Sequence, residues 1–177
     1  RAGRELLPFR AEQVAVHLRR AETALAFRRI FPRNGEEEYE RAALPFLKKS
    51  KTYGKYDTKK LLAIVRSRTD VLEDIPAKLD FLEEYGSIDP ALYFNKKMKS
   101  DAEIAKKVLP AAEAVLAGLE KFENAEIYAA LVQLAQDPSM KNGQVLWCVR
   151  IAVTARENTP GGASEMAELL GKERCLS

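Results

Sequence analysis

The sequence contains few of the residues that most often carry catalysis or bind metals. His17 is the one histidine among 177 residues, and the two cysteines, Cys148 and Cys175, are not spaced as Cys-x-x-Cys. This scarcity argues against a zinc site or a disulfide framework and favours a reducing, cytoplasmic compartment. A Ser-His-Asp triad would have to use His17, and because nothing near it indicates an activated nucleophile, we interpret it as structural. We therefore predict no catalytic residue and no metal ligand.

Long apolar runs and glycine-rich phosphate loops are missing as well. No apolar run approaches the roughly 20 residues needed to cross a bilayer, and Arg1–Glu5 does not lead into a signal peptide. Gly161-Gly162 follows a proline between two predicted helices, unlike a P-loop or a dinucleotide-binding turn. The acidic runs Glu36–Glu38 and Glu83-Glu84 are typical of solvated helix faces. These features predict a chain that binds no cofactor and no membrane.

What the sequence does contain is one helical pattern after another. Hydrophobic residues make up 46% and charged residues 31%, which is typical of a soluble, folded chain. Residues 11–31 form a basic amphipathic stretch, and the breaker cluster Pro32–Gly35 follows it. A second helix is predicted over Glu36–Lys48, and Asp57 is expected to cap a third one with an apolar stripe.

The remaining two-thirds of the chain continue this pattern. Ser100–Glu103 reads as a capping box that opens a long helix, in which Pro110 predicts a kink or a break. Asn124 is expected to cap the next helix. No alternating, β-branched run of strand type occurs, so we predict an all-α fold. The last predicted helices cover Gln144–Thr154 and Ala163–Leu170.

Basic residues next to aromatic ones indicate a possible RNA surface. The formal net charge of +3 is too small to identify a nucleic-acid partner, so the distribution of charge matters more. Lysines attract phosphates, and unpaired bases stack on tyrosine or phenylalanine. Ordinary solvated helix ends would show the same pattern, so both interpretations stay open. The candidate phosphate contacts, close to Tyr53, Tyr56, Tyr93 and Phe94, are Lys48, Lys49, Lys51, Lys55, Lys96 and Lys97.

Several short motifs follow one another from Ala42 to Ser177. They are Ala43–Leu47, Leu72–Pro76, Asp89–Leu92, Lys141–Trp147, Val149–Val153 and Thr159–Ala163 with its continuation to Glu173. In this order and spacing they resemble the C-terminal half of bacterial-type glutamyl-tRNA synthetases, a family of class I aminoacyl-tRNA synthetases. The family's catalytic half, a Rossmann-type nucleotide-binding domain, has no counterpart in the sequence.

The resemblance implies a helical bundle or cage around the tRNA anticodon. Two consecutive small helical subdomains are expected, at residues 36–80 and 81–177, the last helix being truncated. Residues 1–35 match the family poorly, and they either contact the tRNA stem or are unrelated. Cys148 stands where relatives usually have proline, at what is expected to be the first turn of a helix.

The resemblance also implies which residues read the anticodon. Arg68 falls on the arginine that reads the third base, while Arg150 and the loop Thr159, Pro160, Gly161 and Gly162 match the contacts to the first two bases. Arginine offers two donors to a base edge, and a glycine-rich loop lets the backbone approach an unstacked base. Trp147, one helical turn before Arg150, either stacks on a base or fills the core.

The function implied is that of the anticodon-binding region of a glutamate–tRNA ligase. The expected partner is tRNA(Glu), and the chain is expected to be a monomer. Glutamate, ATP and magnesium would be used only through the catalytic domain of the parent enzyme, so this chain alone is expected to be inactive. A free-standing RNA-binding or regulatory paralogue and a helical protein-interaction scaffold are the alternatives. Whether the parent also charges tRNA(Gln) stays open.

Overall fold

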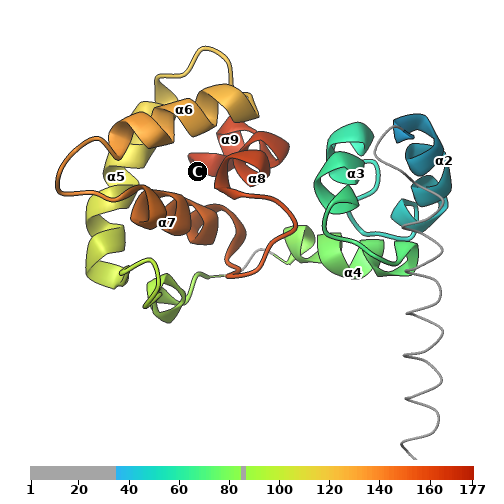
Figure 1. Cartoon of the computed structure of the whole chain (residues 1–177), viewed down its shortest axis with the longest axis horizontal. Helices are drawn as coiled ribbons and strands as arrows, with labels where there is room; N and C mark the ends of the chain where they lie inside the picture. Colours follow the sequence, from blue (N-terminus) through green and yellow to red (C-terminus); the bar gives the residue numbers. More distant parts are fainter. Residues whose placement is uncertain (1–34, 85–86) are drawn as a thin grey trace, which may run out of the picture.

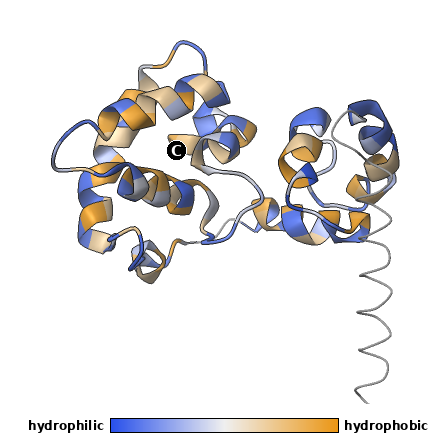
Figure 2. Cartoon of the chain, viewed as in Figure 1, coloured by the Kyte–Doolittle hydropathy of each residue, from blue (hydrophilic) through white to orange (hydrophobic). Residues whose placement is uncertain are grey.

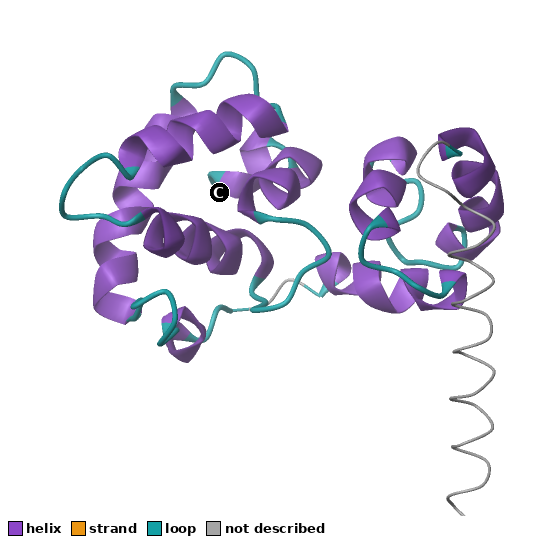
Figure 3. Cartoon of the chain, in the orientation of Figure 1, coloured by secondary structure: helices purple, strands orange, loops and turns teal. Residues whose placement is uncertain are grey.

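The computed structural model describes residues 35–84 and 87–177, and every regular element within these ranges is a helix (Figure 3). An isolated bridge between Asn95 and Ser100 is the one β-type pairing found there. The prediction of an all-α fold is confirmed. The helix predicted over residues 11–31, with His17 and the breaker cluster after it, lies outside the described residues apart from Gly35.

The helices form two groups that lie side by side (Figure 1). We call residues 35–84 the first unit and residues 87–177 the second unit. The predicted subdomain limit at residue 80 falls at the start of η2, which contacts α4 of the first unit. The first unit contains α2 (Glu36–Leu47), α3 (Thr58–Arg66), η1 (Leu72–Asp74), α4 (Ile75–Leu79) and η2 (Asp80–Glu83). The second contains η3 (Pro90–Tyr93), α5 (Ala102–Ala117), α6 (Asn124–Leu134), α7 (Asn142–Thr154), α8 (Ala163–Leu170) and α9 (Lys172–Cys175).

The first unit is built on three amphipathic helices. Along α2, Tyr39, Ala43 and Leu47 recur every four residues and are fully buried against α3 and α4, as a helical stripe requires. Asp57 caps α3 as predicted, since its carboxylate accepts a hydrogen bond from the Lys60 N–H at 2.8 Å. Figure 2 shows hydrophobic and hydrophilic residues alternating along these helices.

The second unit packs around α7. This helix contacts α5, α6 and α8, and Val145, Cys148, Val149 and Ile151 along it are buried. A helix that is covered on most sides must be apolar almost all round. The short helix α8 ends at Gly171 as predicted, where φ is +82°, a conformation that favours glycine. Within the described ranges, none of the helices combines the length and the apolar character that a membrane span needs.

Two predicted helix caps were wrong. Asp101, not Ser100, caps α5, and its carboxylate accepts from the Ile104 N–H at 2.9 Å. Ser100 is buried instead, with its hydroxyl 3.4 Å from Cys148 Sγ. Asn124 is the first residue of α6 and makes no capping hydrogen bond.

Of the kink or break predicted at Pro110, the break is not found, and the expected position of Cys148 needs correction as well. The helix α5 runs without a break from Ala102 to Ala117, and Pro110 lies on its exposed side, where water can satisfy the carbonyl that loses its partner. Cys148 lies in the middle of α7 rather than in its first turn. Burial raises the pKa of its thiol, so this cysteine is a packing residue.

Candidate nucleic-acid interface

The predicted reader Arg68 lies just after α3. The helix ends at Arg66, and the Arg68 N–H donates to the Val65 carbonyl at 3.0 Å in the turn that follows. The Arg68 carbonyl accepts from Lys78 Nζ at 2.5 Å, and the next residue, Thr69, is buried. Hydrogen bonds therefore fix both the N–H and the carbonyl of Arg68, while its side chain stays exposed. This arrangement suits a side chain that must reach a ligand.

A cavity of about 760 Å³ lies between the two units and contains Arg68 in its wall. It brings together three predicted site residues from distant parts of the chain, namely Arg68, Thr159 and Pro160, and one predicted phosphate contact, Lys51. Four cationic side chains and two acidic ones line it, so its charge favours an anionic ligand. The lining residues are Lys51, Arg68, Ala77, Lys78, Asp80, Phe81, Glu84, Arg156, Asn158, Thr159 and Pro160.

The loop Thr159–Gly162 is fixed by its own hydrogen bonds. The Thr159 hydroxyl donates to the Gly161 carbonyl at 2.6 Å, and the Gly162 N–H donates to Glu165 Oε2, also at 2.6 Å. Gly161 is buried, and a β-carbon there would lie 3.3 Å from Ile64 Cγ2 of α3 and 3.0 Å from Met166 Sδ. The loop thus packs directly against the first unit.

Arg150 lies on α7 beside a second cavity of about 360 Å³. Its Nε is buried, and none of the described residues accepts a hydrogen bond from it. Burial lowers the pKa of Arg150, and the positive charge of Arg68 lowers it further, while Glu165 acts in the opposite direction. A buried donor without a partner is costly. Arg150 is therefore placed to donate to an acceptor supplied by a ligand.

The other predicted residues are placed differently. Trp147 is buried, and its indole N–H donates to the Tyr93 carbonyl at 3.2 Å. Of its two interpretations, the core one therefore fits the structure, and base stacking does not. Lys48, Lys49, Lys96 and Lys97 are exposed but line neither of these two cavities.

The prediction of a solvated helix face fits Glu84, whose side chain is about half exposed, but not Glu83, whose side chain is 18% exposed. Glu84 forms an ion pair with Lys51 at 3.6 Å, and Glu83 forms one with Lys55. These two lysines, both candidate phosphate contacts, are already paired in the structure. In the part of the chain that the structure describes, no group of histidine, cysteine or acidic side chains is arranged to hold a metal ion.

Comparison with known proteins identifies the family. The model of the family described as "Anticodon binding domain" matches residues 38–177. This chain belongs to the anticodon binding domain family. The match includes both cavities and every predicted site residue.

The relatives of this anticodon binding domain are glutamate–tRNA ligases. The ligase of Clostridium tetani is 37% identical over 140 residues, which are 79% of this chain and 28% of the relative. The ligase of Lachnoclostridium phytofermentans is 35% identical over 167 residues, 90% of this chain and 34% of the relative. The chain therefore spans about a third or less of the length of the curated relatives it matches. The fold is also similar to that of a solved glutamate tRNA ligase from Elizabethkingia meningosepticum in complex with its amino acid. The TM-score is 0.63 and the sequence identity is 14%, and the match covers 89% of this chain and 30% of the ligase.

The sequence interpretation missed two residues of this anticodon binding domain. Asn124 and Tyr128 line the cavity at Arg150, one helical turn apart on α6. Tyr128 is 48% exposed, and the Asn124 Oδ1 atom is buried without a hydrogen-bond partner among the described residues. An aromatic residue on the solvent side of an amphipathic helix is the signal that would have identified Tyr128.

Proposed function

We propose that this chain binds the anticodon of tRNA(Glu) and positions that tRNA for a glutamate–tRNA ligase. The observation that carries this proposal is the cavity between the units, where Arg68 meets the loop Thr159–Gly162 from a distant part of the chain. The names of the relatives support the choice of tRNA. Glutamate, ATP and Mg²⁺ would be bound by a catalytic domain and not by these residues. We further propose that the chain works as a cytoplasmic monomer.

The residues that line the two cavities have the chemistry needed to read unpaired bases. Arg68 presents a planar fork of donors, which suits the acceptors on the pairing edge of cytosine. Gly162 lines the second cavity and has no side chain, so its backbone groups can approach a base closely. Arg150 adds a buried donor without a partner, and Tyr128 adds an exposed ring on which a base can stack. Single-stranded RNA loops present these features, because their bases are unstacked.

The experiment that tests the proposal is a titration of the chain with anticodon stem-loops. We expect a stem-loop with the glutamate anticodon to bind at least about tenfold more tightly than one of equal length with an unrelated anticodon. The same stem sequence in both RNAs serves as the control for phosphate contacts. Equal affinities for the two would contradict anticodon reading, and no binding of either RNA at low salt would leave a protein-interaction scaffold as the better explanation.

A further inference from the structure

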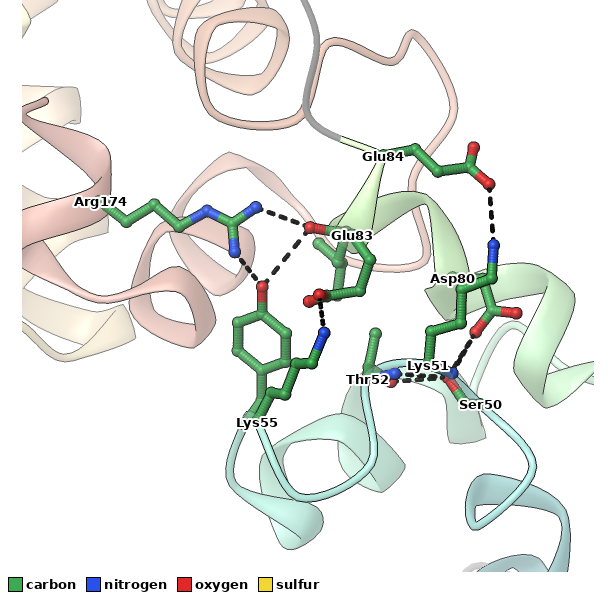
Figure 4. Close-up of polar contacts among 10 residues, drawn as sticks. Ser50, Lys51, Thr52, Lys55, Asp80, Glu83, Glu84 and Arg174 are labelled. Atoms are coloured by element: carbon green, nitrogen blue, oxygen red, sulfur yellow. Dashed lines mark hydrogen bonds and ion pairs between the residues drawn. The ribbon is translucent and has the colours of Figure 1, made fainter.

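The two units are joined by polar side chains near the end of η2, and most of these contacts are drawn in Figure 4. We call Tyr56, Glu83, Glu84, Arg156 and Arg174 the clasp. The first three belong to the first unit and the two arginines to the second. The adjacent carboxylates lie at the end of η2, next to the residues that connect the units. The clasp therefore spans the point at which the chain passes from one unit to the other.

Arg174 makes the most contacts of the clasp. From α9 its guanidinium donates to the Tyr56 hydroxyl and, at 2.6 Å, to the Leu82 carbonyl. It also lies over the Tyr56 ring, 5.8 Å from the ring centre. One side chain thus ties α9 to two segments of the first unit, the turn before α3 and η2 (Figure 4). Arginine is suited to this because its fork can serve two acceptors at once.

Two ion pairs also connect the units, but one is weaker than the contacts of Arg174 and the other lies on another part of the junction. Arg156 donates to Glu84 Oε2 at 3.2 Å, but both side chains are about half exposed, and water screens such a pair. Lys60 of α3 pairs with Glu168 of α8 at 2.9 Å on another part of the junction. The Tyr56 hydroxyl is half-buried, so its bond to Arg174 is less screened than the Arg156 pair.

The junction matters for the site because the site is divided between the units. Arg68 belongs to the first unit, whereas Arg150 and the loop Thr159–Gly162 belong to the second. The separation of the two units therefore sets the distance between these reading residues, and the contacts of Arg174 across the junction help to fix that separation. A base-reading site needs its donors held within a fraction of an ångström of the productive geometry.

We propose that Arg174 is a positioning residue for base discrimination: it holds the two units at the separation at which Arg68 and the loop Thr159–Gly162 can read neighbouring bases together. The proposal rests on the proposed function for its RNA ligand. Its structural part, the fixed separation of the units, does not depend on RNA. Arg174 itself lies outside both reading cavities.

The experiment compares Arg174→Gln with Arg41→Gln in the full chain. Arg41 is an exposed arginine of α2, so its substitution removes the same charge far from the junction. Spin labels on cysteines introduced at the exposed positions Glu73 and Glu120, in a Cys175→Ser background, report the distance between the units. Binding of anticodon stem-loops with cytosine or guanine as third base reports discrimination. Arg174→Lys, which keeps the charge but not the fork, is the milder second variant.

We expect Arg174→Gln to broaden the distance distribution and to lower the preference for cytosine by about threefold or more. Arg174→Lys should lie between Arg174→Gln and the parent, and Arg41→Gln should match the parent in both measurements. An unchanged distance distribution in Arg174→Gln overturns the proposal, whether or not RNA binds. A broadened distance distribution with an unchanged preference for cytosine over guanine overturns the role of Arg174 in base discrimination. If the parent binds neither stem-loop, the proposed function fails, and the distance measurement still decides the positioning role.

Discussion

Arg68 and Arg150 carry the same charge in different surroundings. Arg68 is exposed after the end of α3, so water solvates its charge, and the charge is available to a ligand. Arg150 is partly buried, and burial lowers its pKa. The exposed residue is therefore suited to discrimination by charge and geometry, and the buried one to a directional hydrogen bond that a correct base completes.

The first prediction concerns Arg68→Gln. Glutamine keeps a hydrogen-bonding side chain but lacks the charge and the fork of donors. We expect the preference for a cytosine over a guanine as third anticodon base to fall about tenfold, since a base contact is worth roughly 1–3 kcal/mol. Unfolding free energy should change by less than about 0.5 kcal/mol because the side chain is exposed. Stem-loop binding to both proteins measures this, and an identical ratio would make Arg68 a structural arginine.

A second prediction at this scale concerns Tyr39 in alkaline solution. Burial raises the pKa of Tyr39 to about 12 from its ordinary value of 10.0, against the opposing charge of Arg66. The unfolded chain then loses this proton first, so the stability is complete below pH 10 and falls as the pH rises towards 12. We expect Tyr39 to account for a loss of about 2 kcal/mol over this window.

Urea unfolding at pH 9 and pH 11.5 tests the role of Tyr39. The variant Tyr39→Phe should lose less stability between these two pH values than the parent. Cys175, whose pKa burial raises to about 11, is present in both proteins and affects both curves equally. Parallel pH dependence in the two proteins would show that Tyr39 does not titrate in this range.

At the scale of single elements, the helix starts allow a matched comparison. Asp101 caps α5 with a hydrogen bond of 2.9 Å to the Ile104 N–H, whereas Asn124, a similar residue at the start of α6, caps nothing. We expect Asp101→Ala to lower the free energy of unfolding by about 1 kcal/mol. Asn124→Ala should change it by less than about 0.5 kcal/mol. Urea denaturation of both variants measures the difference, and equal losses would disprove the assignment of the cap.

The loop Thr159–Gly162 provides a second comparison between elements. A β-carbon at Gly161 would lie 3.0 Å from Met166 Sδ and 3.2 Å from Glu165 Cβ, closer than ordinary contact. At Gly118 the nearest atom would be at 3.5 Å. We expect Gly161→Ala to cost about 1–3 kcal/mol through overpacking and Gly118→Ala to be neutral or slightly stabilising. Thermal and urea unfolding decide this, and a neutral Gly161→Ala would mean that the loop can shift.

At the scale of the whole molecule, charge governs the approach of RNA. The net charge is only +3, and Lys51 and Lys55 are engaged with Glu84 and Glu83. Lys96 and Lys97 are exposed in the turn between the bridged residues Asn95 and Ser100, and none of the ion pairs between described residues involves them. Long-range attraction to phosphates would then come from Lys96 and Lys97 rather than from the lysines paired with Glu83 and Glu84.

The double variant Lys96→Gln/Lys97→Gln tests this distribution of charge. We expect affinity for tRNA to fall steeply with salt for the parent, and the slope of log affinity against log salt to decrease by about one to two in the variant. The ratio between cytosine and guanine stem-loops should stay the same, because phosphate contacts carry no sequence information. The double variant Lys106→Gln/Lys107→Gln on α5 removes the same amount of charge from another place and serves as the control. A salt slope equal to that of the parent would remove Lys96 and Lys97 from the RNA surface.

The sequence by itself determined the fold class and most of the helices. Apolar residues at helical spacing and local signals such as Asp57 and Gly171 act between neighbours in the chain, so the sequence shows them directly. The motifs from Ala42 onward also indicated the family, and with it Arg68, Arg150 and the loop. Ser100 and Asp101 were both possible caps of α5, and the structure buries Ser100 beside Cys148 while Asp101 caps the helix, an outcome that involves packing between distant residues.

The tertiary structure alone decided how the site is assembled. Arg68 and Thr159 are 91 positions apart in the sequence, and only the packing of the two units brings them to one cavity. The same packing brought Glu84 to 3.2 Å from Arg156 of the second unit, whereas packing within the second unit buried Trp147 against Tyr93. Such outcomes depend on contacts between distant residues, whose free energies are small differences between burial, pairing and desolvation. A single sequence carries no direct signal for them.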